Sequence, residues 1–256
     1  MFNWDALLYS RFLMERTQPA IDLARRIPLK EAHRVIDIGC GPGNSTRVIA
    51  DRFPEAKVTG ADCSEDMIRQ AGEQYPDLHF ILFDAMTDFE KLTEKYDVVF
   101  SNACIQWIPD QPKLIRDMAE ALNPGGVMAV QLPYNYDEPI HRIIREVADR
   151  EPWREKLKGA REKYTLEISE YAELLAEVTD SFELWMTTYY HRMPTHESIL
   201  EWYRGTGLRP YLVHLDATEA DAYEQEVLAE IRKAYPAQTN GEILFRFPRL
   251  FFMAEK

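Results

Sequence analysis

A glycine-rich turn that follows a short apolar run is the clearest candidate for a ligand site in this sequence. The run Val35 to Ile38 leads into Gly39, and Gly41 and Gly43 follow at alternate positions. Glycine permits sharp bends and lets the backbone approach a ligand that a Cβ would block. Because open α/β sheets bind nucleotides where a strand ends in such a loop, the pattern predicts a cofactor loop. A purely structural turn is the alternative.

Polar side chains stand at the ends of three further expected strands. They are Asp62, Asp84 and Asn102. Parallel strands joined by helices point the same way, so these ends should line one rim together with Gly39. Asp62 follows the turn by about twenty residues, the spacing at which a carboxylate meets ribose hydroxyls. The ordered set predicts a nucleotide-like cofactor more strongly than the turn alone.

Hydrophobic spacing and turn residues predict the elements that position these groups. We expect strands at 35–38, 57–61, 79–83, 96–101, 127–132, 182–193 and 242–253, and helices at 19–27, 45–53, 64–74, 113–122, 138–150, 196–203 and 217–235. The stretch 123–126 reads as a tight turn, and Pro248 suits an edge strand or a bulge. The alternation predicts the α/β class, with a second half of different character.

Length and charge limit the remaining possibilities. We expect one domain over residues 1–256. Residues 195–241 should form a helical cap, because this segment between two expected strands is too long for a loop without secondary structure. A net charge of -13 argues against nucleic acid or an anionic membrane as partner. Three cysteines without metal-ligand spacing, the absence of a signal-peptide pattern and the absence of a long apolar run predict a cytoplasmic protein. The oligomeric state stays open.

The glycine spacing separates two kinds of cofactor. A dinucleotide loop reads G-x-G-x-x-G, whereas here Asn44 stands where the third glycine belongs. The pattern instead resembles motif I of the class I S-adenosylmethionine-dependent methyltransferases. That resemblance implies a Rossmann-like fold with a mostly parallel seven-stranded sheet, one antiparallel strand, and a leader over residues 1–28 that acts as a lid. The alternative for this leader is a helix that packs its apolar side on the body of the protein.

The same resemblance implies how S-adenosylmethionine is held. Asp62 would bind both ribose hydroxyls, Asp84 would accept from the adenine amino group, and Met67 would cover the ring unless it is a core methionine. The Ala85 N–H would face the ring, and Asn102 and the loop would hold the methionine part. The full set of cofactor candidates is Tyr9, Arg16, Asp37, Gly39, Cys40, Gly41, Asn44, Asp62, Cys63, Met67, Asp84, Ala85, Asn102 and Gln106.

Further stretches resemble the trans-aconitate 2-methyltransferases over nearly the whole length. They include residues 102–110, 129–133, 187–191, 206–210 and 247–251. Membership would imply methyl transfer to a carboxylate of trans-aconitate, giving a monomethyl ester. The alternatives are another small or lipid-like carboxylic acid, an S-adenosylmethionine-binding protein without catalysis, and, last, a dehydrogenase.

A carboxylate that accepts a methyl group needs little activation by the protein. It is already ionised at neutral pH, so we expect no general base, no catalytic triad and no metal, only placement of the reactants. Arginine suits a polycarboxylate because of its paired N–H groups. Arg209 and Arg249 rank above Arg16 and Arg246, and a surface salt bridge is the alternative for each. The expected catalytic set is Gln106, Trp107, Tyr190, His191, Arg209 and Arg249, with a core position as the alternative for Trp107.

Overall fold

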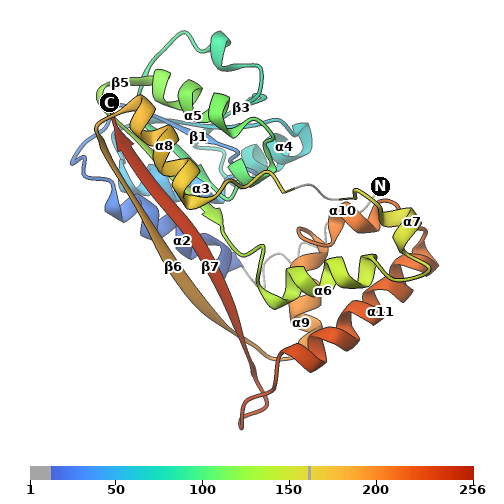
Figure 1. Cartoon of the computed structure of the whole chain (residues 1–256). Helices are drawn as coiled ribbons and strands as arrows, with labels where there is room; N and C mark the ends of the chain where they lie inside the picture. Colours follow the sequence, from blue (N-terminus) through green and yellow to red (C-terminus); the bar gives the residue numbers. More distant parts are fainter. Residues whose placement is uncertain (1–12, 161–162) are drawn as a thin grey trace. The chain divides into compact units, whose positions relative to one another are not determined.

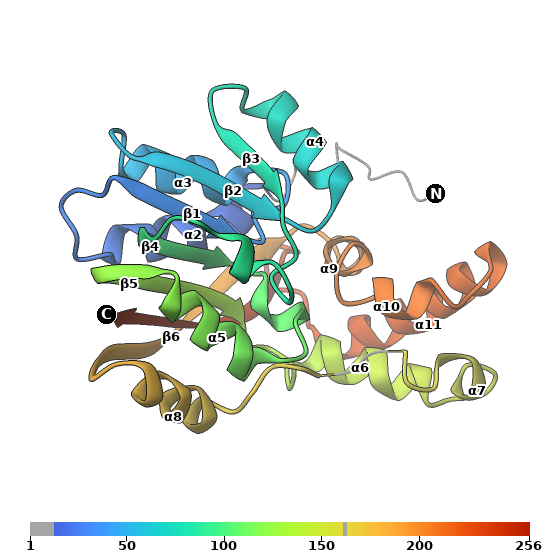
Figure 2. The same cartoon turned by 90° about the horizontal axis from the view of Figure 1, so that it is seen from above.

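The computed structural model describes residues 13–160 and 163–256. Its centre is a seven-stranded sheet with the strand order β3-β2-β1-β4-β5-β7-β6 (Figures 1 and 2). The strands are β1 (Arg34–Ile38), β2 (Lys57–Asp62), β3 (His79–Leu82), β4 (Tyr96–Asn102), β5 (Leu122–Pro133), β6 (Ser181–Met193) and β7 (Ile243–Glu255). Strands β1 to β5 pair in parallel, and β7 runs antiparallel to β5. The expected α/β class and mixed seven-stranded sheet are confirmed.

Two details of the sheet differ from the sequence prediction. Pro248 does not mark an edge strand, because β7 lies between β5 and β6. Its pairing with β5 begins only at Arg249, so the missing N–H of the proline breaks no rung of that ladder. The stretch 123–126 is not a separate turn but part of β5, where the register against β4 shifts. Gly126 is needed there because a Cβ would approach the Asn123 carbonyl oxygen to 2.9 Å.

The chain folds into two compact units. The sheet unit comprises residues 14–133, 164–187 and 249–256. Its helices are α2 (Leu13–Arg26), α3 (Asn44–Arg52), α4 (Glu65–Gln74), α5 (Gln111–Glu120) and α8 (Ile168–Val178), with the 3₁₀ turns η1 (Phe89–Lys91) and η2 (Ile105–Trp107). Ser64 caps α4 as expected, accepting a hydrogen bond from the Met67 N–H at 3.4 Å.

Two successive residues of β7 show which helices cover each face of the sheet. Phe251 stacks on Trp185 at 5.2 Å, and the Arg26 guanidinium of α2 lies over that indole. Phe252 points to the other face, where its ring lies 5.6 Å from that of Tyr171 in α8. Since successive strand residues alternate between faces, α2 and α8 cover opposite sides of the sheet (Figure 1).

Helix α2 begins earlier than its apolar spacing predicted. It starts at Leu13 rather than Pro19, so the proline lies inside it. Ala20, Leu23 and Ala24 are buried, and this apolar face offsets the hydrogen bond that proline cannot donate. Among the described helices, none is both long enough and apolar enough to cross a membrane.

The helical unit comprises residues 134–160 and 188–248 of the described chain. It holds α6 (Pro139–Ala148), α7 (Arg154–Leu157), α9 (His196–Arg204), α10 (Arg209–Leu212) and α11 (Ala217–Ala234), together with parts of β6 and β7. Its core is apolar and aromatic, built around Ile140, Val147, Trp202, Tyr223 and Phe245. Helices α6 and α7 thus share this unit with the segment 195–241.

Candidate active site

The three glycines of the loop after β1 meet three different constraints. Gly39 has φ +74°, and a Cβ there would lie 2.1 Å from the Cys104 sulfur. Gly43 has φ +93°, and its Cβ would lie 2.8 Å from the Tyr75 ring. Of the three, only Gly41, with φ +53°, would place its Cβ where no atom of the described residues lies within 4 Å. The expectation that all three approach a ligand is therefore too simple, because Gly39 and Gly43 are required by packing inside the protein.

Asp37, the carboxylate within β1, has the partners that its burial demands. Its Oδ2 accepts hydrogen bonds from Ser45 Oγ at 2.7 Å and Thr46 Oγ1 at 2.8 Å, both at the start of α3. The side chain is fully buried, and desolvation raises its pKa from the ordinary 3.8 to about 6. The two hydroxyls oppose that rise without cancelling it. Asp37 thus ties β1 to α3 directly beneath the loop.

Asp62 holds the other side of the same loop. Its Oδ2 accepts from the Gly41 N–H at 2.9 Å, and its Oδ1 accepts from the Ser64 N–H at 2.9 Å. The Gly39 N–H donates to the Ala61 carbonyl at 2.7 Å. Each carboxylate oxygen can accept more than one hydrogen bond, so Asp62 can still receive two ligand hydroxyls while it shapes the loop.

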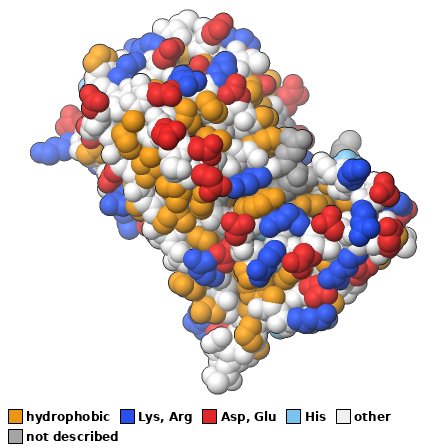
Figure 3. Space-filling view, in the orientation of Figure 1, with side chains coloured by type: hydrophobic (Ala, Val, Ile, Leu, Met, Phe, Trp, Pro, Cys, Tyr) orange, Lys and Arg blue, Asp and Glu red, His pale blue; other side chains and the backbone are white. Residues whose placement is uncertain are grey.

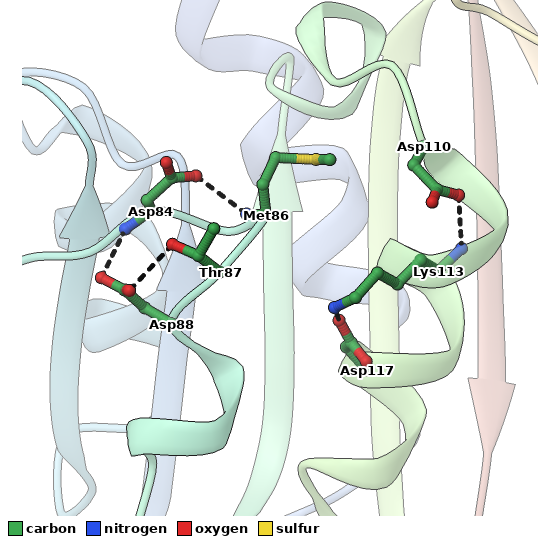
Figure 4. A network of polar contacts seen from close by, with 7 residues as sticks. All are labelled: Asp84, Met86, Thr87, Asp88, Asp110, Lys113 and Asp117. Atoms are coloured by element: carbon green, nitrogen blue, oxygen red, sulfur yellow. Dashed lines mark hydrogen bonds and ion pairs between the residues drawn. The ribbon is translucent and has the colours of Figure 1, made fainter.

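Asp84, at the end of β3, is exposed and organises a short turn (Figure 4). Its side chain accepts from the Met86 N–H at 2.9 Å, and its own N–H donates to Asp88 at 3.1 Å. Thr87 donates to the same Asp88 carboxylate. The turn is therefore built locally, which leaves the exposed Asp84 carboxylate accessible to a donor such as an exocyclic amino group. Met67 and Ala85 are half-buried, so Met67 is not a core methionine.

The segment after β4 carries an unusual backbone conformation. Ala103 has φ +55°, the only positive φ among the described residues other than glycine. Its N–H donates to the Gln131 carbonyl at 2.8 Å, and its carbonyl accepts from Gln106 Nε2 at 2.6 Å. These bonds hold a conformation that costs an alanine about 1–2 kcal/mol. They also fix the Gln106 amide, so that its Oε1 has one direction.

Four buried oxygen atoms around the loop and the end of β4 have no hydrogen-bond partner among the described residues. They are Asp37 Oδ1, Asn44 Oδ1, Asn102 Oδ1 and Gln106 Oε1. A buried acceptor without a donor costs about 1–3 kcal/mol, so such a cluster indicates a ligand that brings donors. Oxygen acceptors and the carboxylates at positions 37 and 62 favour a ligand with positive charge and hydroxyl groups. A dinucleotide would bring a pyrophosphate, which these groups repel.

The thiols of this region are kept neutral. Cys40 and Cys104 line the loop, and burial together with the Asp37 and Asp62 charges raises both of their pKa values, that of Cys104 to about 12. Cys63 is exposed, and its thiol pKa is also raised. A thiol is a weak nucleophile compared with its thiolate, so these cysteines do not compete for an activated alkyl group.

Comparison with known proteins identifies the family to which this site belongs. Residues 35–126 match the model of a methyltransferase domain. The chain is 43% identical to trans-aconitate 2-methyltransferase of Variovorax paradoxus, with 100% of this chain and 99% of that one covered. It is 46% identical to the enzyme of the same name from Rhodopseudomonas palustris strain BisB18, with full coverage of both. The chain belongs to the trans-aconitate 2-methyltransferase family.

Solved structures agree on the fold of this methyltransferase. The YcgJ protein of Bacillus subtilis matches with a TM-score of 0.63 at 14% identity, covering 93% of this chain and 98% of that one. Phosphoethanolamine N-methyltransferase 2 of Haemonchus contortus, solved in complex with S-adenosyl-L-methionine, matches with a TM-score of 0.55 at 21% identity, covering 93% and 52%. At such identities the likeness concerns the fold alone.

The expected catalytic residues of the methyltransferase fall into both units. In the sheet unit, Arg249 is buried and its Nη1 donates to Gln131 at 3.2 Å, whereas Trp107 is 45% exposed. The alternative that Trp107 belongs to the core is therefore wrong. In the helical unit, His191 is buried and its ring lies 5.0 Å from that of Trp202, and Tyr190 is exposed. Arg209 is exposed at the start of α10.

The two lower-ranked arginines lie in different units. Arg246 forms an ion pair with Glu138 in the helical unit, which accounts for its charge without a substrate. Arg16 lies half-buried in α2. Tyr9 lies outside the described residues.

Sequence reasoning missed the residues that support the site from beneath. Ser45 and Thr46 bind Asp37, and only the observation that a strand carboxylate needs a partner hinted at them. Gln111 and Tyr171, both fully buried, are hydrogen-bonded to each other, and Gln111 Nε2 donates to the Ile105 carbonyl in η2 at 2.9 Å. These contacts join α8 and α5 to the turn that carries Gln106. The Gln111–Tyr171 contact joins positions 60 residues apart, so no local pattern could reveal it.

Proposed function

We propose that this protein transfers a methyl group from S-adenosylmethionine to a carboxylate of trans-aconitate, giving the monomethyl ester and S-adenosylhomocysteine. The observation that carries the proposal is the full-length identity to trans-aconitate 2-methyltransferases, because it spans the helical unit as well as the sheet unit. The cofactor supplies a methyl group already activated on a sulfonium. The acceptor-lined loop fits its ammonium and ribose hydroxyls.

Residues of the sheet unit would bind this cofactor by complementary chemistry. Asp62 accepts from hydroxyl groups, and the exposed Asp84 accepts from an amino group at the far end. Asn44, Asn102 and Gln106 offer oxygen atoms that lack donors within the described part of the protein. No atom of the described chain lies within 4 Å of the position that a Gly41 Cβ would take, so the backbone there can approach a ligand closely.

The acceptor needs no activation, since a carboxylic acid with a pKa near 4 is ionised at neutral pH. The work of this chain is therefore to bind two molecules, align them and exclude water. In the sheet unit, Arg249 is proposed to hold a carboxylate of the acid, with Gln106 and Trp107 as further contacts. In the helical unit, Arg209 is proposed to bind a carboxylate through its paired N–H groups, and Tyr190 and His191 are proposed as hydrogen-bond donors. No side chain is assigned as a general base. Asp37 Oδ2 accepts from Ser45 and Thr46, and its Oδ1 is proposed as an acceptor for the cofactor, so no proton transfer is assigned to this carboxylate.

The proposal extends to partners and compartment. On the face seen in Figure 3, basic and acidic side chains are interspersed, with no extended basic patch that would favour nucleic acid. The net charge of -13 points the same way. The three cysteines are free thiols, which suits the reducing cytoplasm.

Incubation with S-adenosylmethionine and a panel of carboxylic acids tests the proposal, with mass spectrometry to detect methyl esters. We expect a single methyl ester from trans-aconitate at a higher rate than from di- and monocarboxylates. A higher rate with an apolar acid would contradict trans-aconitate as the substrate but would still support carboxyl methylation as the reaction. Cofactor binding without any ester would contradict the proposed reaction.

A further inference from the structure

Two buried donors meet where β5 and β7 run side by side. The Gln131 side chain is fully buried, and Arg249 is 3% exposed. Arg249 pairs with Pro133 and Gln131 pairs with Phe251, so the two side chains lie diagonally on one face of the antiparallel pair. Arg249 Nη1 donates to Gln131 Oε1 at 3.2 Å. This contact sets the amide with its oxygen toward the guanidinium and its nitrogen away from it.

The Gln131 amide nitrogen is the second feature of this place. Among the described residues, no acceptor lies within hydrogen-bond distance of Nε2. Leaving a buried amide donor unpaired is unfavourable, and a leucine or methionine would fill the same space without that cost. A glutamine at this position is explained if an acceptor from outside the protein binds there.

The strand register locates this donor relative to the cofactor loop. Asp37, Phe100 and Ala129 form one row across β1, β4 and β5. The residues two positions further along these strands are Gly39, Asn102 and Gln131, and side chains two apart share a face. With two strand spacings between them, the backbone of Gly39 and that of Gln131 lie about 10 Å apart. A small polycarboxylate spans such a distance.

Neighbouring positions of that row have opposite polarity. Within the described chain, Asn102 on β4 has an acceptor oxygen without a partner, and Gln131 on β5 has a donor without a partner, with the Arg249 cation beyond it. Acceptors suit a cationic cofactor over β1 and β4, whereas donors suit an anionic acid over β5 and β7. The polarity changes where the two reactants would meet.

We propose that Gln131 Nε2 and the Arg249 guanidinium form a subsite for a non-reacting carboxylate of the substrate, which makes Gln131 a specificity-determining residue. The inference rests on the proposed function and adds to it the place of one carboxylate. One oxygen of that group accepts from the amide, and the guanidinium supplies the compensating charge. The Gln131–Arg249 contact orients both donors before the acid arrives.

Substitutions of Gln131 that keep its length test the subsite. Gln131→Met removes the donor, and Gln131→Glu places a second anion where the acid should bind. Wild type and variants are compared for the KM of trans-aconitate and of a dicarboxylate with the same double bond but one carboxylate fewer. We expect the methionine variant to raise the KM of trans-aconitate by about 10-fold to 100-fold, as for a lost hydrogen bond to a charged group, and the glutamate variant to raise it further.

The control measurements separate recognition from folding. The KM of the dicarboxylate lacking that group and the calorimetric Kd of S-adenosylhomocysteine should change less than about 2-fold, as expected for sites that do not share the contact. Gln111→Met is the matched control, because Gln111 is equally buried but has partners for both of its amide atoms. It should lower the melting temperature and leave the ratio of the two KM values unchanged.

Two results would overturn the subsite. One is a Gln131→Met variant that melts earlier but discriminates between the two acids as the wild type does. The other is an equal loss of both acids. Calorimetry with trans-aconitate and the S-adenosylhomocysteine complex separates this inference from the proposed function. Binding that depends on Gln131 without any ester contradicts only the reaction, and turnover that ignores Gln131 contradicts only the subsite.

Discussion

Replacing Asp37 with asparagine should make the protein more stable while weakening its hold on the cofactor. Asp37 is fully buried, and its pKa is raised from 3.8 to about 6, chiefly by desolvation. An acid whose pKa is raised on folding stabilises the protein below its unfolded pKa, and that contribution is lost as pH rises through the folded value. At neutral pH the folded protein therefore carries the cost of an ionised buried group.

The size of this cost follows from the two pKa values. A rise from 3.8 to about 6 corresponds to about 3 kcal/mol of unfolding free energy at pH 8. At pH 4, where the native carboxyl is protonated, about 0.5 kcal/mol remains. The asparagine of the variant would resemble the protonated acid and could still accept from Ser45 and Thr46 through its oxygen. For 256 residues, 3 kcal/mol is a rise in melting temperature of roughly 5 °C at pH 8.

Urea unfolding at pH 4 and pH 8 measures the effect on either side of the isoelectric point near 5.0. Asp37→Asn should be more stable than the wild type at pH 8, with the gain nearly absent at pH 4. Calorimetry with S-adenosylhomocysteine should show weaker binding, because an amide N–H₂ replaces the free Oδ1 acceptor. Asp97→Asn is the control of opposite sign. Burial raises the pKa of Asp97, but hydrogen bonds from the His33 N–H, the Asn123 amide and the Arg34 N–H outweigh burial and lower that pKa, so its contribution to stability is lost as pH falls.

Equal gains at both pH values would refute the reasoning, because they would show that ionisation of Asp37 is not the cause. A variant less stable than the wild type at pH 8 would mean that the hydrogen bonds from Ser45 and Thr46 outweigh desolvation. Unchanged cofactor affinity would remove Asp37 from the set of acceptors that face the ligand.

Three further predictions follow from the loop and the arginines. Gly39→Ala should lower the unfolding free energy by about 3 kcal/mol or more, because its Cβ would overlap the Cys104 sulfur. Gly41→Ala should lower it by only about 1–2 kcal/mol and should mainly weaken cofactor binding. Urea unfolding and calorimetry check both variants, and equal losses of stability would contradict the distinction. Asp62→Ala should weaken S-adenosylhomocysteine binding by about 1–3 kcal/mol in calorimetry, since it removes an acceptor and frees the Gly41 N–H, and an unchanged affinity would exclude the ribose role. Arg209→Ala should leave the melting temperature unchanged, because the side chain is exposed, but should lower kcat/KM for the acid by a factor that corresponds to about 2–4 kcal/mol. Arg249→Lys should lower kcat/KM comparably, since lysine lacks the paired N–H groups. Normal kinetics in both variants would make the arginines structural.

Much of the fold could be predicted because its signals are local. Apolar runs that end in Asp62 or Asn102, and the N-cap at Ser64, depend on residues a few positions apart. Alternation of strands and helices then leads to a parallel sheet, and parallel strands bring their polar ends to one rim. The choice of a methyl-donor cofactor over a dinucleotide could also be made from a local signal, the spacing of the glycines.

Tertiary structure decided what each site residue does, because the deciding contacts join distant segments. Gly39 is required by Cys104, which the pairing of β1 with β4 brings beside it. Arg246 meets Glu138 across the helical unit, and Arg249 meets Gln131 only because β7 lies against β5 in antiparallel register. Burial, and with it the raised pKa of Asp37, appears only when α3 covers the sheet. The sequence determined which groups reach the rim, and the packing of distant strands determined which of them remain available to a ligand.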